Sequence, residues 1–321
     1  MKQLENNNLT LVDLFCGAGI GAVGFKLAGY NIIAAVDNKQ YAVDTYNLNI
    51  GNHARVADVR KLDKENLPYA DVYVGGFPCT PFSEAGTQKG QFDTKDGDLG
   101  AHFYRLVKAI QPKSFVAENV KGLTFKKHRG FFKWLLESLE ICGYNVTWKL
   151  INCHDYGVPQ DRERVFIVGI RKDLNKTFEF PKPVKEEERT YLRDAIGDLP
   201  DPKSNHNIKN HKEYYDGGYS PRYLSRNRQR QWNQPSFTIV STARQLPLHP
   251  EPPNYDIRKM DEYDHEPPRR FTVRECLRIQ SVPDWFYFDD SIKLDKQYER
   301  CSGIPSLFAY KLGIELAKYL Q

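Results

Sequence analysis

Short apolar runs recur along the first half of the chain, and each ends at a glycine or an acidic residue. They lie at 9–12, 31–36, 72–74 and 114–117, and their length is typical of buried strands. A glycine-rich turn and a helical pattern separate the first two runs, and 101–110 is also helical in pattern. Strands that alternate with helices predict an α/β fold.

The later apolar pattern predicts a hairpin, with strands at 146–151 and 165–170, and an amphipathic closing helix at 307–320. One helical stripe is expected to face the core and comprises Phe131, Trp134, Leu135, Leu139 and Cys142. The long polar segment at 84–100 is interpreted as a mobile lid, because such loops are uncommon unless they are functional or disordered.

The composition changes after Pro181. Residues 182–188 are charged and contain proline, which indicates a linker. From 203 to 232 there are seven Lys and Arg residues against two acidic ones, interleaved with aromatic residues. This mixture is typical of a surface that follows nucleic-acid phosphates, although a solvated loop region has the same composition.

The 321 residues are enough for one large core with a smaller lobe. The chain has 40% hydrophobic and 27% charged residues, no apolar run of about 20 residues and no signal peptide, so we expect it in the cytoplasm. Its six cysteines have no CxxC spacing, so we expect neither a disulfide framework nor a metal site. The net charge of +5 is mild, and its distribution is more informative than its size.

The stretch at 71–83 carries the strongest chemical signal. It forms a strand, turns at Gly75 and Gly76, and reaches Cys79 between two prolines. A single cysteine is usually a buried structural residue. This one lies at the carboxyl end of a strand, where open sheets place their chemistry, so we interpret Cys79 as a positioned nucleophile.

Three acidic residues stand at or near the ends of predicted strands. Asp37 is placed to accept hydrogen bonds from ribose hydroxyls. Asp58, with Val59, offers a carboxylate and an apolar wall to a purine, although a solvated loop aspartate is an equal alternative. Glu118 stands at the same edge as Cys79 and is a candidate proton donor, against the alternative of an ionised surface glutamate.

Two arginines alternate in the connection of the predicted hairpin. Arg162 and Arg164 would face one side of an extended chain, where they would contact a ligand or remain plain surface charges. The glycines at 17, 19 and 21 allow a nucleoside to approach the backbone. Their spacing differs from the G-x-G-x-x-G of dinucleotide folds, which opposes a NAD oxidoreductase.

Five motifs resemble, in sequence order, those of the cytosine-5 DNA methyltransferases of bacterial restriction–modification systems, and the match spans nearly the whole chain. Each motif is a modest signal, whereas five in order are a strong one. They are 13–19 (DLFCGAG), 76–79 (GFPC), 118–120 (ENV), 160–164 (QDRER) and 274–280 (RECLRIQ).

The resemblance implies a Rossmann-like S-adenosylmethionine-dependent methyltransferase sheet with a smaller, irregular target-recognition domain. Residues 1–182 and 291–321 would form the catalytic domain, and 183–290 the target-recognition domain and hinge. The implied reaction transfers a methyl group from S-adenosylmethionine to carbon 5 of a cytosine flipped out of duplex DNA.

The mechanism that the resemblance implies begins with attack of the Cys79 thiolate on carbon 6 of cytosine. Glu118 would hydrogen-bond ring nitrogen 3, and Arg162 and Arg164 would hold the 2-oxo group and the adjoining phosphate or loop. Contacts with the cofactor are expected from Phe15, Gly17, Ala18, Gly19, Asp37, Asp58, Val59 and Pro78. Contacts with DNA are expected from Arg226, Arg228, Arg244 and Ser83.

The chain departs from the family pattern at three positions. Ser302 stands where the family commonly has an asparagine, in the segment that supports the methionine end of the cofactor. His102 replaces a leucine beside the adenine, and Asn38 replaces an aromatic residue that often stacks on it. We therefore expect a different adenosine pocket with the activity retained.

The three arginines at 226, 228 and 244 flank residues 235–243, a layout similar to the recognition segment of relatives that act on GC-rich palindromes such as GGCC. Arginine reaches the two major-groove acceptors of guanine bidentately, so Arg244 is the leading candidate for reading guanine. Phosphate binding alone is the competing interpretation.

The nearest alternative function is a tRNA cytosine-5 methyltransferase on the same scaffold, against which the separate basic segment favours duplex DNA. A catalytically silent DNA-binding module is opposed by the intact Pro78, Cys79 and Glu118. We expect a monomer in the bacterial cytosol, associated with the nucleoid, with a cognate restriction endonuclease acting separately.

Overall fold

A computed structural model describes residues 1–77 and 99–321, and the chain divides into two compact units. The first comprises Met1–Asn152, Glu163–Lys182 and Ala309–Gln321, and the second comprises Cys153–Arg162 and Pro183–Phe308. The chain thus changes unit four times, after Asn152, Arg162, Lys182 and Phe308. Most of the predicted lid lies outside the described residues, and its last two residues begin helix α3.

The first unit is built on one seven-stranded sheet in the order β3-β2-β1-β4-β5-β7-β6. The first five of its strands along the chain run parallel, whereas β7 runs antiparallel to both β5 and β6. The predicted α/β class is confirmed, and so is the hairpin. The strands are β1 (Thr10–Leu14), β2 (Asn31–Asp37), β3 (Ala54–Val56), β4 (Val72–Gly75), β5 (Ser114–Val120), β6 (Tyr144–Asn152) and β7 (Glu163–Arg171).

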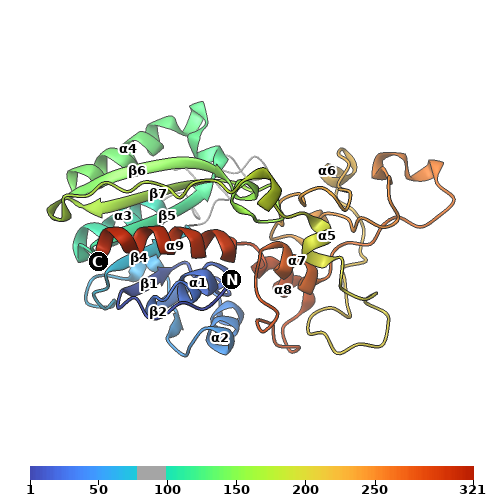
Figure 1. Ribbon diagram of the computed structural model, residues 1–321, viewed down its shortest axis with the longest axis horizontal. Coiled ribbons are helices and arrows are strands. Elements are labelled where there is room, and N and C mark those ends of the chain that lie inside the picture. Colours follow the sequence, from blue (N-terminus) through green and yellow to red (C-terminus); the bar gives the residue numbers. More distant parts are fainter. Residues whose placement is uncertain (78–98) are drawn as a thin grey trace. The chain divides into compact units, whose positions relative to one another are not determined.

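Helices lie on both faces of this sheet (Figure 1). From β1 the chain moves to β2 in one direction across the sheet, and from β4 it moves to β5 in the other direction. Because crossovers between parallel strands are right-handed, the connecting helices α1 and α3 cover opposite faces. Helix α9 packs closely on α1, because a Cβ at Gly313 would lie 3.1 Å from Phe25 Cδ1. The helices of this unit are α1 (Ile20–Leu27), α2 (Gln40–Asn49), α3 (Leu99–Ile110), α4 (Arg129–Ile141) and the greater part of α9 (Ser306–Leu320).

The core beneath α3 and α4 contains alternate residues of the strands, among them Val12, Tyr73 and Phe115. The prediction that Trp134 belongs to this core is wrong, because the side chain is 40% exposed. Its ring stacks on Phe131 with centroids 5.5 Å apart, at the outer side of the helix. The stripe of apolar residues on α4 is therefore wider than the part of the helix that is buried.

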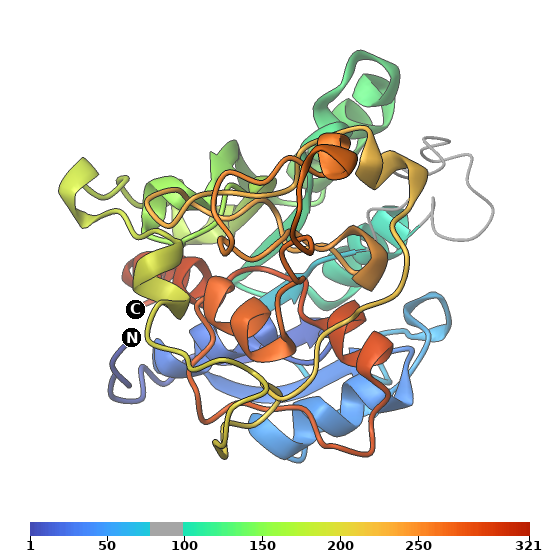
Figure 2. The same cartoon turned by 90° about the vertical axis from the view of Figure 1, so that its right-hand side faces the viewer.

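The second unit consists mostly of loops and short helices, as the yellow to orange chain in Figure 2 shows. Buried polar pairs hold it together. Arg269 donates two hydrogen bonds of 2.7 Å to the carboxylate of Glu275, which is 1% exposed. The hydroxyl of Thr272 caps α7 by accepting from the Glu275 amide. The helices are α5 (Leu192–Ile196), α6 (Pro221–Leu224), α7 (Val273–Ile279) and α8 (Leu294–Arg300).

Within residues 1–77 and 99–321, no helix combines the length and the apolar character that crossing a membrane requires.

Candidate active site

The carboxyl ends of the five parallel strands meet at one edge of the sheet, and the strand order reverses between β1 and β4. Open α/β sheets bind ligands outside the carboxyl ends of their strands at such a switch point. The described residues at or just beyond this edge include most of the predicted ones of the first unit: Phe15, Gly17, Ala18, Gly19, Asp37, Asp58, Val59 and Glu118.

The turn after β1 has an unusual backbone. Gly17 and Gly19 have φ values of 53° and 95°, and Phe15, a bulky residue, has a φ of 62°. Left-handed backbone at a bulky residue is uncommon and is often found at functional sites. No described atom lies within 4 Å of the Cβ that a side chain at Gly17 would add, so a ligand has room there.

Asp37 ties this turn to the end of β2. Its Oδ2 accepts a hydrogen bond of 3.0 Å from the Gly17 amide, and its Oδ1 accepts one of 3.0 Å from the Lys39 amide. A carboxylate has about four acceptor positions, more than the two that these bonds use. Neighbouring Asn38, one of the departures from the family pattern, is exposed.

Asp13 is a residue that the sequence interpretation missed as a separate candidate. It lies in β1 between Ala35 of β2 and Val74 of β4, and it is 7% exposed. Burial, together with the negative charge of Asp37, raises the pKa of the Asp13 carboxyl to about 8. The signal available in the sequence was an acidic residue inside an apolar run.

The segment after β3 differs slightly from the prediction. The strand ends at Val56, and Asp58 instead caps the 3₁₀ turn Val59–Lys61 by accepting from the Arg60 amide at 3.1 Å. The guanidinium of Arg60 also lowers the pKa of the Asp58 carboxyl. Val59 is 4% exposed and belongs to the core, so its expected contact with a purine stays a prediction.

Glu118 lies inside β5, which continues to Val120 because β7 pairs with it along its whole length. Its Oε1 lies 3.0 Å from Arg164 Nε, and the two side chains are 11% and 13% exposed. This Oε1 is buried and, among the described residues, has no partner in hydrogen-bond geometry. The other oxygen, Oε2, lies 3.5 Å from where a Cβ at Gly76 would be, beside the exit of β4.

Asn119 is a second residue whose importance the sequence interpretation missed. It is 1% exposed, and its Nδ2 donates a hydrogen bond of 3.2 Å to the carbonyl oxygen of Phe77. Phe77 is the last described residue before position 78. Pro78, Cys79 and Ser83 themselves lie outside the described residues.

His102, another departure from the family pattern, lies in α3. Its Nδ1 accepts a hydrogen bond of 3.3 Å from Arg105 Nε. Arg105 in turn donates to the carbonyl oxygen of Val59 at 3.2 Å. The histidine is therefore connected to a predicted cofactor residue through one arginine.

The second unit contains Arg162, which is 2% exposed. Its Nη1 donates to the carbonyl oxygen of Ile239 at 3.3 Å, and its Nη2 donates to Ser302 Oγ at 3.4 Å. The serine that replaces the family's asparagine therefore helps to hold this arginine. Arg164 belongs to the first unit, so the two alternating arginines have different local partners.

The predicted DNA contacts in the second unit differ in how exposed they are. Arg226 and Arg244 are exposed, and Arg244 Nε donates to the Tyr215 hydroxyl at 3.3 Å. Arg228 is half-buried, with its guanidinium 5.3 Å from the ring centre of Phe237, and burial lowers its pKa. Arg228 is thus engaged in packing, whereas the other two guanidinium groups face solvent.

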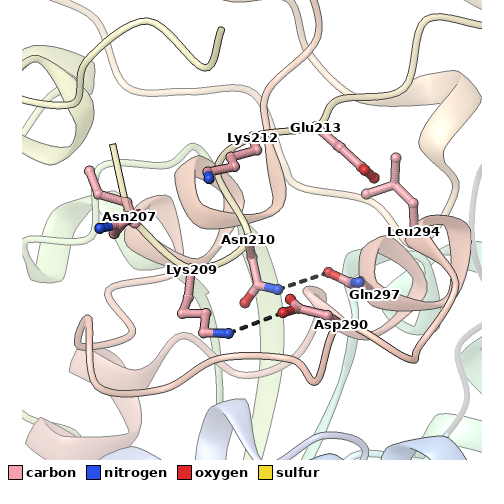
Figure 3. A pocket seen from close by; sticks show the side chains of 9 residues that line it. Asn207, Lys209, Asn210, Lys212, Glu213, Asp290, Leu294 and Gln297 are labelled. Atoms are coloured by element: carbon pink, nitrogen blue, oxygen red, sulfur yellow. Dashed lines mark hydrogen bonds and ion pairs between the residues drawn. The ribbon is translucent and has the colours of Figure 1, made fainter. Parts of the chain in front are cut away.

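A pocket of about 510 Å³ also lies in this unit, between the basic segment at 203–232, Asp290 and the start of α8 (Figure 3). Lys209 Nζ pairs with Asp290 at 3.0 Å, and Asn210 Nδ2 donates to Gln297 Oε1 at 3.1 Å. These contacts use much of the polar lining internally. In the part of the chain that the structure describes, no cluster of His, Cys, Asp and Glu could hold a metal ion.

Comparison with known proteins shows which family this chain resembles. The family model for C-5 cytosine-specific DNA methylase matches residues 9–313. The Type II methyltransferase M.FnuDI of Fusobacterium nucleatum is 43% identical over 297 residues, which cover 87% of this chain and 86% of the relative. M.MthTI of Methanothermobacter thermautotrophicus is 40% identical over 332 residues, covering 98% of each chain.

Solved structures share the fold. A putative DNA modification methyltransferase encoded within a prophage of E. coli has a TM-score of 0.72 at 23% identity, covering 98% of this chain and 99% of that one. The S. pombe Dnmt2 methyltransferase has a TM-score of 0.71 at 18% identity, covering 98% of each chain. At these identities, the likeness shows the fold alone.

Proposed function

The chain belongs to the family of C-5 cytosine-specific DNA methylases, and on that premise we propose how its residues carry out the reaction. It is a DNA (cytosine-5-)-methyltransferase of the restriction–modification type. Family membership also implies methyl transfer that depends on S-adenosylmethionine. The residue roles below are our proposals.

One observation supports the residue roles above all others. The Glu118 carboxylate lies beside Gly76, and Asn119 holds the carbonyl oxygen of Phe77. Both contacts fall where the chain enters Pro78 and Cys79. A carboxyl group near the nucleophile suits a reaction in which the thiolate attacks the ring and the carboxyl group donates a proton to the resulting anion.

The chemistry of the base follows from these two groups. The Cys79 thiolate forms a bond to carbon 6, while the carboxyl group of Glu118 donates a proton to ring nitrogen 3 and so neutralises the negative charge pushed into the ring. Carbon 5 then takes the methyl group and loses its proton to solvent water, and the electron pair of the broken C–H bond re-forms the double bond and expels the Cys79 thiolate. Arg164 holds Glu118 in place. The proposed contacts of Arg162 and Arg164 with the 2-oxo group and the adjoining phosphate or loop stay predictions, because Arg162 is buried and donates to Ile239 and Ser302.

The described residues fit the expected cofactor. The turn at 15–19 has open space at Gly17, and Asp37 lies beside that turn, where a ribose hydroxyl could donate to its carboxylate. Phe15, Ala18, Gly19, Asp58, Val59 and Pro78 complete the proposed contact set. S-adenosylmethionine, when bound, supplies an electrophilic methyl group. The chain's own contribution is to bind the nucleoside and leave the reacting edge open.

We assign recognition to the second unit, whose residues 183–290 form the proposed target-recognition domain and hinge. Two exposed arginines, Arg226 and Arg244, are suited to a guanine-rich site such as GGCC, and Arg244 is the first candidate for base reading. Arg228 supports them by packing, and Ser83 is a further proposed DNA contact. The catalytic domain would comprise 1–182 and 291–321.

Sequencing of methylated bases in cells that express the chain tests the function. The expected result is 5-methylcytosine at one short duplex motif, with none in cells that express Cys79→Ser. Methylation of tRNA without methylation of duplex DNA would instead establish the alternative RNA function. The proposal also places a monomer in the bacterial cytosol near the nucleoid, with a separate restriction endonuclease of the same specificity.

An alanine at Arg244 tests the recognition proposal. A base reader should lose roughly 1–3 kcal/mol on the cognate site and relax one position of the motif. A phosphate contact would weaken all sequences alike. If Arg244→Ala methylates the same motif with undiminished selectivity, other residues read the base.

A further inference from the structure

A basic segment follows directly after the strand that carries Glu118. Residues 119–136 contain five Lys and Arg residues and no acidic one. We propose that these residues, the basic edge, bind the phosphates of duplex DNA that flank the recognition site. This inference rests on the proposed function, and it assigns DNA binding to the catalytic unit as well. The basic edge comprises Lys121, Lys126, Lys127, Arg129 and Lys133.

Most of the charge on the basic edge is available to a ligand. Lys126, Lys127, Arg129 and Lys133 are exposed. In the described part of the chain, Lys126 and Arg129 lie within 4 Å of no carboxylate. The pair between Lys133 and Glu137, at 3.5 Å, lies in solvent, where such pairs contribute little. The edge is therefore a local excess of positive charge.

The stability of the free protein does not explain this placement. The basic edge surrounds the first turn of α4, where the helix dipole favours negative charge. This turn has no acidic residue, and its N-cap, His128, makes no side-chain capping bond. Lys126, Lys127 and Arg129 thus carry positive charge at the positive end of the helix. A polyanion at the edge would turn that repulsion into attraction.

The basic edge also lies close to the proposed catalytic groups within the same unit. Lys121 Nζ pairs with Glu163 at 2.9 Å, next to Arg164, which pairs with Glu118. At the far end, a Cβ at Gly100 would lie 2.9 Å from Phe131 Cζ and 3.2 Å from Phe77 Cε2. The first turn of α4 is thus packed near the chain that leads to Cys79.

Duplex DNA is the partner that this arrangement fits. A duplex carries one negative charge per about 1.7 Å of its axis, so a segment beside the flipped base brings several phosphates along the protein. Phosphate contacts fix the position of a duplex without reading its sequence. The basic edge would therefore increase affinity and hold the flanking duplex, while recognition stays with other residues.

The test compares two triple variants with equal loss of charge. One is K126Q/K127Q/R129Q, and the control is K172Q/K176Q/K318Q on the same unit. Lys172 and Lys176 follow β7, whose carboxyl end lies at the sheet edge opposite Glu118. Affinity is measured over a salt series on duplexes of about 12 and about 30 base pairs that share the recognition motif, since each phosphate contact adds about 0.9 to the salt slope. Thermal melting verifies that both variants fold.

On the longer duplex, the basic-edge variant should lose about 2 to 3 from the slope of log affinity against log salt, because three contacts are removed. On the shorter duplex the loss should be smaller, and the control should match the wild type on both. If the basic-edge variant keeps the wild-type slope on the longer duplex, the proposal is overturned. That result is expected if the edge binds an acidic protein and not DNA. Methylation by the wild-type enzyme is assayed in parallel, so failure of the proposed function is recognised separately.

Discussion

Asn119 Nδ2 donates a hydrogen bond to the carbonyl oxygen of Phe77, across the neighbouring strand ends of β5 and β4. The bond is buried, and Asn119 Oδ1 accepts in turn from the Val120 amide. One side chain therefore fixes both Phe77, two residues before Cys79 in the sequence, and the end of the strand that carries Glu118. We regard Asn119 as a positioning residue.

Replacing Asn119 should lower kcat more than it raises KM for the cofactor. Asn119→Ala leaves the Phe77 carbonyl unpaired, which costs roughly 1–3 kcal/mol of stability. Asn119→Asp keeps an acceptor for Val120 but loses the donor. Because a misplacement of about 1 Å can cost about 100-fold in rate, we expect a reduction of up to about that size in both variants. Full kcat in Asn119→Asp would show that the bond to Phe77 has no positioning role.

Glu118→Gln should reduce the single-turnover rate of methyl transfer by roughly 10²–10⁴-fold. The amide keeps the size of the side chain but cannot transfer a proton to ring nitrogen 3. Binding of duplex DNA should change little, and the matched control is Glu140→Gln, at an exposed carboxylate of α4. A Glu118→Gln rate close to that of the control would exclude Glu118 from the chemistry.

Asp37→Ala should weaken cofactor binding, measured by calorimetry. Loss of a hydrogen bond to a charged group costs roughly 1.5–3 kcal/mol, which corresponds to about 10- to 100-fold in affinity. The Gly17 amide also loses its hydrogen bond to Asp37, which should weaken cofactor binding further. Asp44→Ala on the exposed side of α2 is the control. Equal affinity in both variants would place the ribose contact elsewhere.

Asp13 should make the stability of the protein depend on pH. Its pKa in the folded protein is about 8, against an ordinary 3.8, so the folded state holds the proton more tightly. The contribution to stability is complete below about pH 4 and is lost as the pH rises to about 8. Asp13→Asn should lack this dependence, so its melting temperature relative to the wild type should rise between pH 5 and pH 8. A constant difference over that range would contradict the assignment.

The sequence predicted the fold well where local patterns decide structure. The apolar runs that end in Asp37 and Gly75 form strands, as predicted. Strands of a parallel sheet are buried on both faces, so they are recognisable as short, nearly continuous apolar runs. The end of β5 was placed too early, at Ala117, because its last residues are polar. Their strand conformation comes from pairing with β7, which is a contact distant in sequence.

The candidate site was predicted only in part, for the same physical reason. Motif residues such as Asp37 and Glu118 could be found from their position after apolar runs. The roles of Asn119 and Asp13 depend on which strands are neighbours, and a local pattern does not contain that information. The exposure of Trp134 likewise depends on how far the core extends under α4.

Covalent capture tests the central claim, that Cys79 is the nucleophile, most directly. The wild-type enzyme is incubated with S-adenosylmethionine and a duplex that carries 5-fluorocytosine at the target position. Because this base has no proton at carbon 5 to lose, Cys79 should stay bonded to carbon 6 and give an adduct that survives denaturation. Cys79→Ser should fold, bind the duplex and give no adduct. An adduct of equal yield in Cys79→Ser would contradict the claim.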